Sequence, residues 1–175
     1  MKITRRVSPI VLLFFGVFTI AVASRPTFSR HSSLQAPKKE PPMTQHATGA
    51  FDVKLTPLDP AFKTEDTSIA RMSIDKQFHG ALEASSKGEM LSAATSIKGS
   101  AAYVAIERVS GSLNGRTGSF ILQHNATMNR GTPSLSITVV PDSGTGQLEG
   151  LTGTMNIIIA NGKHSYDFTY TLPSK

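Results

Sequence analysis

The sequence predicts an all-β domain that closes into an antiparallel eight-stranded barrel. From Gly49 onward, apolar and polar residues alternate with a period of two in short runs that turn residues separate about every ten residues. The last run places Tyr166, Phe168, Tyr170 and Leu172 on one face. Such a strand needs both a core and a partner for its edge, and pairing with the first strand supplies them. A two-layer sandwich is the alternative.

The first half of this domain contains five expected strands. The first is expected to end at Pro57, since proline cannot donate a ladder hydrogen bond. A central Gly88 in the third indicates a bulge or bend. The fourth and fifth are joined by Asn114-Gly115, a pair that supplies the positive φ of a tight hairpin. The five expected ranges are Gly49–Leu55, Ile69–Gly80, Leu82–Leu91, Ser100–Ser110 and Gly118–Met128.

The second half continues the pattern with three or four further strands. A β-branched run ends at Pro141, and the loop after it is dense in residues that tolerate unusual φ. A short returning strand follows this loop. Asn161-Gly162 then makes a second hairpin between the last two strands. The expected ranges are Ser134–Val140, Gln147–Leu151, Gly153–Ala160 and Lys163–Leu172.

The chain is expected to have three parts, namely a signal peptide at 1–23, a disordered linker at 24–46 and the barrel at 47–175. The first part has basic residues, then an apolar helical stretch, then small residues before Ser24, which is the pattern of a secretory signal. The linker is rich in Pro, Ser and charge and lacks an apolar period. We therefore expect an exported protein, periplasmic or secreted. The alternative is an inner-membrane anchor formed by an uncleaved signal.

Charge and composition exclude several classes of partner. Residues 1–46 hold seven of the 18 basic residues and one of the 12 acidic ones, so residues 47–175 hold eleven of each. A neutral domain lacks the clustered cations of nucleic-acid recognition, so membrane contact is expected only through the signal segment. The chain has no Cys, and its histidines and acids are scattered. We therefore expect no metal site and no cofactor.

Four segments resemble the bacterial domain-of-unknown-function family numbered 3224, in one order between about Ala47 and Pro173. They are FHGALEASSKGEML (78–91), GSAAYVAIERVSGSLNGRTGSFILQH (99–124), VVPDSGTGQLEGLTG (139–153) and GKHSYDFTYTLP (162–173). The resemblance implies a fold like that of allene oxide cyclase, an eight-stranded antiparallel barrel with a small lumen. The resemblance implies no particular activity, since the family has none assigned. Family members are often cytoplasmic and lack a signal peptide, so the expected signal peptide of this chain differs from the usual family pattern.

Glu107 and His124 are the candidate catalytic residues. Glu107 shares a strand face with Tyr103, and antiparallel pairing about Asn114-Gly115 places it near 121–123, within reach of His124. If it faces the lumen, desolvation is expected to raise its pKa toward general acid or base duty. The alternatives are a surface Glu107 with a basic neighbour and a structural His124.

Five other side chains are candidates for ligand binding. Glu83, with Ser86 and His79, forms a second possible polar cluster, although isolated charges on strands are usually solvated. The remaining candidates would bind a ligand if their strand faces point into the lumen, which the strand pleat alone does not decide. The five are Tyr103, Glu83, Phe120, Tyr166 and Tyr170.

Three functions follow from a closed barrel with few convergent charges. The leading hypothesis is a module that binds a small apolar molecule in the lumen. The second is an isomerase or cyclase that uses the Glu107 and His124 pair to move a proton, a weak inference because it rests on fold analogy. The third is a structural or partner-binding barrel with a filled interior, which can be a homodimer through an outer face.

Overall fold

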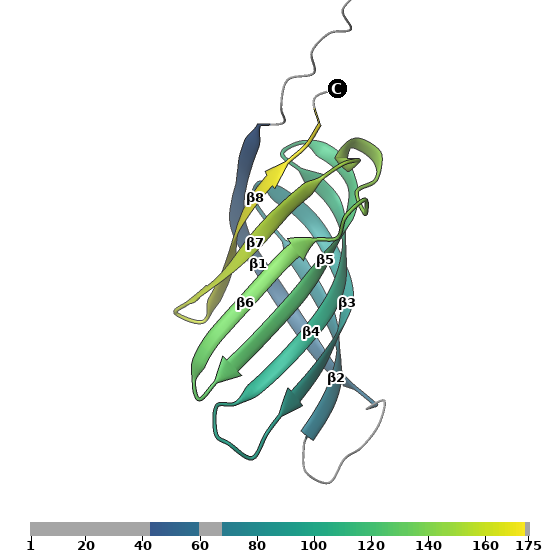
Figure 1. Cartoon of the computed structure of the whole chain (residues 1–175). Helices are drawn as coiled ribbons and strands as arrows, with labels where there is room; N and C mark the ends of the chain where they lie inside the picture. The colour runs from purple at the N-terminus through teal and green to yellow at the C-terminus, as the bar shows by residue number, and fades with distance from the viewer. Residues whose placement is uncertain (1–42, 60–67, 174–175) are drawn as a thin grey trace, which may run out of the picture. The chain divides into compact units, whose positions relative to one another are not determined.

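The computed structural model describes residues 43–59 and 68–173, so the expected signal segment and almost all of the expected linker lie outside the described residues. The described residues form a closed barrel in which each strand pairs antiparallel with its neighbours in the sequence and the last pairs with the first (Figure 1). The strands are β1 (Thr44–Leu58), β2 (Ser68–Phe78), β3 (Leu82–Ala94), β4 (Ala101–Leu113), β5 (Arg116–Asn129), β6 (Thr132–Val139), β7 (Thr152–Ala160) and β8 (Lys163–Thr171). Closure of an eight-stranded barrel, rather than a sandwich, is confirmed.

The two Asn-Gly hairpins are confirmed. Asn114 has φ 46° and Gly115 φ 80°, and Asn161 has φ 51° and Gly162 φ 73°. These left-handed pairs match the twist of the strands they join, so Leu113 pairs with Arg116 and Ala160 with Lys163. The first hairpin fixes the register that places Glu107 opposite Leu122, as expected from the sequence.

β1 is longer than the sequence indicated at both ends. The strand begins at Thr44 and includes three residues of the expected linker, Thr44 to His46, because these residues pair with β8 as far as Thr171. They show no alternation of apolar and polar residues, so the sequence pattern does not identify them as part of a strand. At the other end Pro57 does not stop the strand and lies opposite Met72. Its tolerance follows from its place beyond Phe51, where β8 no longer pairs with β1 and no hydrogen-bond donor is needed on that side.

Two local expectations in the middle of the chain are wrong. Gly88 forms no bulge, since β3 pairs without interruption with both β2 and β4, and a side chain there would collide with the backbone of Ile106 and Glu107. The segment 147–151 is no strand. It contains a short 3-10 helix, Gly146–Leu148, because Gly146 and Gly150 adopt φ 62° and 76° and break the extended path.

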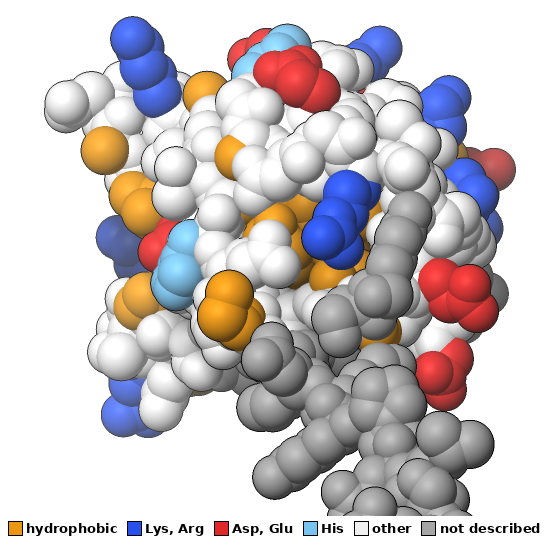
Figure 2. All heavy atoms as spheres, turned by 90° about the horizontal axis from the view of Figure 1, so that it is seen from above, with side chains coloured by type: hydrophobic (Ala, Val, Ile, Leu, Met, Phe, Trp, Pro, Cys, Tyr) orange, Lys and Arg blue, Asp and Glu red, His pale blue; other side chains and the backbone are white. Residues whose placement is uncertain are grey.

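The upper end of the barrel, where β1 begins and β8 ends, is packed with side chains. Leu148 and Leu151 from the loop between β6 and β7 are both 1% exposed and cover this end of the core. Aromatic rings lie directly below, with Phe120 stacked on Phe168 at 5.7 Å between ring centres. Seen from above, hydrophobic side chains occupy the centre of this end (Figure 2). The barrel is therefore solid here rather than hollow.

The lower half of the barrel is open on one side. β8 pairs with β1 only from Phe51 upward, so the β7–β8 hairpin closes the upper half alone. Below it, the inner faces of β3 to β6 form a concave surface that is partly exposed, with Met128 43% and Leu135 41% accessible. The architecture thus offers one accessible stretch of inner wall, and the candidate site lies there. The described residues contain no helix long and apolar enough to cross a membrane.

Candidate functional site

Four polar side chains converge inside the barrel at mid-height, and we call them the ionic cluster: Lys76, Ser86, Glu107 and His124. Alternation in β2, β3, β4 and β5 turns each of them inward, and each is at most 9% exposed. Lys76 Nζ donates to Glu107 Oε2 over 2.7 Å, and His124 Nε2 lies 3.0 Å from the same oxygen. The Ser86 hydroxyl donates to Glu107 Oε1. The expected approach of Glu107 and His124 is therefore present.

The carboxyl of Glu107 is held ionised. Burial alone raises its pKa, but the neighbouring His124 ring, the charge and hydrogen bond of Lys76, and the hydrogen bond from Ser86 together outweigh burial. The pKa falls from 4.5 to about 2. The expectation that desolvation raises this pKa toward neutrality is therefore wrong, because His124, Lys76 and Ser86 together lower it by more than burial raises it. A carboxylate with this pKa that already accepts hydrogen bonds from Lys76 and Ser86 is a poor proton acceptor at neutral pH.

Lys76 is the functional residue that the sequence analysis missed. Its ammonium lies 5.3 Å from the ring centre of Phe51 and 5.6 Å from that of Phe78, in addition to its contact with Glu107. These rings stabilise the cation within the core. A signal existed in the sequence: Met72, Ile74 and Phe78 share one face of the strand, and Lys76 completes the same alternation.

An apolar trough adjoins the ionic cluster on the lower side. It is a cavity of about 280 Å³ on the inner wall of β3 to β6, and its principal inward side chains are Met90, Tyr103, Ala126, Met128 and Leu135. In β4 only Ala105 separates Tyr103 from Glu107 on the inner face, and in β5 the cluster's histidine directly precedes Ala126 on that face. The trough therefore ends next to the cluster along the inner wall, although no residue of the cluster lines it.

Tyr103 is the aromatic residue that lines the trough, and it carries a hydroxyl group. It is half-buried, and its hydroxyl makes no hydrogen bond to any residue that the structure describes. Burial, and secondarily the charge of Glu107, raises the pKa of Tyr103 above its ordinary 10.0. The hydroxyl consequently stays protonated and is free to donate a hydrogen bond to a molecule in the trough.

Three other candidate ligand-binding residues lie inside the barrel but in its packed upper half. Phe120, Tyr166 and Tyr170 are each 1% exposed. The Tyr166 hydroxyl accepts from the Leu82 amide at 2.8 Å and donates to the His79 carbonyl at 3.1 Å. Tyr170 is similarly hydrogen-bonded, to the side chains of Asn114 and Gln45. These rings seal the upper end and do not line the trough.

Glu83 does not face the lumen, and of the second cluster expected around it only the contact with His79 is present. Its side chain points outward, where it accepts from the Gly80 amide at 2.6 Å and lies 3.7 Å from His79 Nδ1. Ser86, which was expected to join it, faces inward to Glu107. The strand pleat separates residues three positions apart onto opposite faces. Glu83 is therefore a surface residue of the first hairpin.

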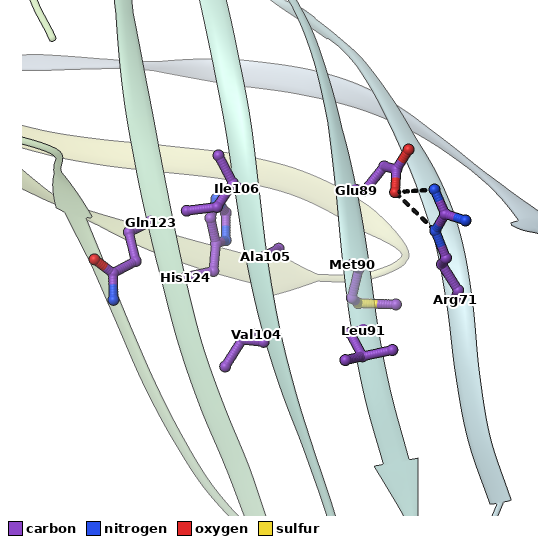
Figure 3. A pocket seen from close by; sticks show the side chains of 9 residues that line it. All are labelled: Arg71, Glu89, Met90, Leu91, Val104, Ala105, Ile106, Gln123 and His124. Carbon is purple, nitrogen blue, oxygen red and sulfur yellow. Dashed lines mark hydrogen bonds and ion pairs between the residues drawn. The ribbon is translucent and has the colours of Figure 1, made fainter. Parts of the chain in front are cut away.

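A second depression, of about 410 Å³, lies over the outer surface of β2 to β5. Figure 3 shows Leu91, Val104 and Ile106 there, beside an ion pair in which Arg71 Nη2 lies 2.7 Å from Glu89 Oε2. These side chains are on the opposite face of the wall from the trough. No group of three or more His, Cys, Asp or Glu side chains that could hold a metal ion occurs among the described residues.

Comparison with known proteins places this barrel among proteins without an assigned activity. Residues 47–170 match the model of a family described as a protein of unknown function, DUF3224. A solved structure of a DUF3224 family protein of unknown function from Shewanella oneidensis MR-1 is 50% identical, with a TM-score of 0.71. The likeness covers 76% of this chain and 100% of that one. No curated protein matches the chain.

Proposed function

Because this chain belongs to the DUF3224 family, whose description assigns no activity, we propose its function from the site: the barrel binds one small, mainly apolar molecule in the trough. The observation that carries the proposal is the coincidence of an open, mainly apolar cavity with the half-buried hydroxyl of Tyr103, for which no protein hydrogen-bond partner is found among the described residues. Ligand pockets are commonly of this kind, apolar with a few placed polar groups. A volume of about 280 Å³ restricts the ligand to a small molecule.

The contacts define which ligand chemistry fits. Met90, Met128 and Leu135 supply flexible apolar surface, and methionine side chains adapt to ligands of irregular shape. The protonated Tyr103 hydroxyl favours a hydrogen-bond acceptor, such as a carbonyl or hydroxyl oxygen, at the end of the ligand that reaches inward. The ionic cluster lies beyond it on the same inner wall, where hydrogen bonds from Lys76 and Ser86 to Glu107 tie β2, β3 and β4 together.

Filling the trough is expected to weaken the binding of an apolar probe. We expect the protein to bind Nile red saturably, with fluorescence enhancement, and Ala126→Phe to weaken that binding at least about tenfold, equivalent to about 1.4 kcal/mol. Ala126 is 9% exposed and faces the trough. Asn125→Phe is the matched control, since the neighbouring side chain faces the outer surface. Absence of saturable binding, or equal loss in both variants, would contradict the proposal.

The isomerase alternative has weaker support. It requires Glu107 or His124 to exchange a proton with a substrate. Glu107, however, has a pKa of about 2, so its carboxyl is ionised at neutral pH, and it already accepts hydrogen bonds from Lys76 and Ser86. A fold like that of allene oxide cyclase provides a pocket but no chemistry of its own. The cluster is better suited to holding the wall of the trough than to moving a proton.

We further place the protein outside the cytoplasm, on the pattern of its first 23 residues. The expected result is that expression of the full chain in a Gram-negative host yields periplasmic protein whose N-terminal sequencing begins at Ser24. The apolar stretch is also near the shortest length that spans a bilayer. Recovery of the intact chain in the inner-membrane fraction would favour the anchored alternative, and recovery in the cytosol would exclude both.

A further inference from the structure

β7 has one backbone edge that is unpaired along most of its length among the described strands. β7 pairs with β8 from Thr152 to Ala160, but with β6 only where Thr154 lies opposite Thr138. Among the described residues, Met155 to Ala160 therefore has no strand partner on the β6 side. A row of free N–H and C=O groups of this kind is a template for another strand.

The chemistry of this edge is unusual for an unpaired strand. β7 has the sequence TGTMNIIIA, without any charge or proline. Ile158 is 51% and Ile159 66% exposed. Another open edge of the barrel, the lower part of β1, carries Asp52, Lys54 and Pro57, the residue types that normally block pairing between edges. The lower β1 edge is thus protected against pairing, and the β7 edge is not.

We propose that the β7 edge is a dimerisation surface that pairs antiparallel with β7 of a second copy of this chain about a two-fold axis. Antiparallel pairing centred on Ile157 places this residue opposite Ile157 of the second copy. Met155 then lies opposite Ile159 of the second copy, and Asn156 lies opposite its Ile158. One such contact satisfies both free β7 edges at once, as a closed, isologous dimer requires. The pairing continues the sheet across two barrels.

Charge favours a second copy over other occupants. Residues 47–175 hold eleven basic and eleven acidic residues, so this part of the chain adds no net charge repulsion between two copies. The uncharged β7 edge offers nothing to select a charged peptide. The free edge of β6 is a poorer partner because Pro133 lacks an N–H. This inference does not depend on ligand binding in the trough.

Light scattering during size-exclusion chromatography of the full chain at micromolar concentrations tests the proposal. We expect the unmodified protein to be a dimer, and Ile158→Lys to raise the dimer dissociation constant at least about tenfold, because it places two like charges in the paired edge. Ile159→Lys is expected to act in the same direction. Val104→Lys is the matched control: Val104 is 53% exposed on the outer face of β4, in the depression of Figure 3.

The N-terminal segment is present in every variant, so differences between variants report the barrel surface alone. Circular dichroism establishes that each variant folds. A monomeric unmodified protein would overturn the proposal, as would dimers that persist in both isoleucine variants. Dissociation by Val104→Lys but not by Ile158→Lys would move the interface to the outer face of β4. Assemblies larger than a dimer would indicate open, heterologous pairing instead.

Discussion

Replacement of Glu107 with leucine is expected to lower the free energy of unfolding by about 3–5 kcal/mol. Glu107 is 0% exposed and is the acceptor for both Lys76 and Ser86. Without it, the lysine ammonium, whose side chain is only 6% exposed, is buried without a counter-charge. The expected loss is large because removal of one partner leaves the desolvation cost of the other uncompensated. Urea denaturation followed by circular dichroism measures it.

Two comparisons distinguish an ionic from a steric origin of this loss. Lys76→Met together with Glu107→Leu removes both charges, and we expect the double variant to be more stable than the single Glu107→Leu variant. Glu89→Leu removes a carboxylate that pairs with Arg71 at 2.7 Å on the surface, and its expected cost is at most about 1 kcal/mol. A Glu107→Leu variant no less stable than Glu89→Leu would refute a buried ion pair that supports the wall of the trough.

The strand period and the turn chemistry explain how much of this fold was predictable. Asn114-Gly115 and Asn161-Gly162 set local geometry that depends on few other residues, so both hairpins were placed correctly. Closure followed from the aromatic face of the last strand. The segment Gly146–Leu148 was misassigned because its apolar residues pack as a cap over the barrel end, a tertiary role that a period of two cannot distinguish from a strand.

The candidate site was only partly predictable, for a different reason. Pairing register brought Glu107 and His124 together correctly, since it follows from one hairpin. The direction of the shift in the Glu107 pKa depends on His124, Lys76 and Ser86 together, and Lys76 lies on β2, two strands away along the barrel wall. Long-range contacts of this kind decide the electrostatics of a barrel interior. The open lower half was likewise not predicted, because it depends on how far β8 extends along β1.

Acidification is expected to remove the stabilisation that Glu107 provides, over a defined pH window. The pKa of this carboxyl is 4.5 as an ordinary glutamate and about 2 in the folded protein. Between these values the unfolded chain binds a proton that the folded protein does not, so the free energy of unfolding decreases as the pH decreases. The contribution of Glu107 to the free energy of unfolding is about 3 kcal/mol. It is fully present well above pH 4.5 and is lost as the pH falls to about 2.

The measurement compares the unmodified protein with the Lys76→Met, Glu107→Leu double variant, because other carboxylates contribute to acid unfolding in both. Urea denaturation at closely spaced pH values from 5 to 2 gives the free energy of unfolding for each protein. We expect the difference between the two proteins to change by about 3 kcal/mol across this range, in favour of the double variant at low pH. A difference that stays constant would mean that Glu107 has an ordinary pKa in the folded barrel. The ionic cluster would then not hold its charge, and proton exchange by Glu107 would regain support over a purely structural role.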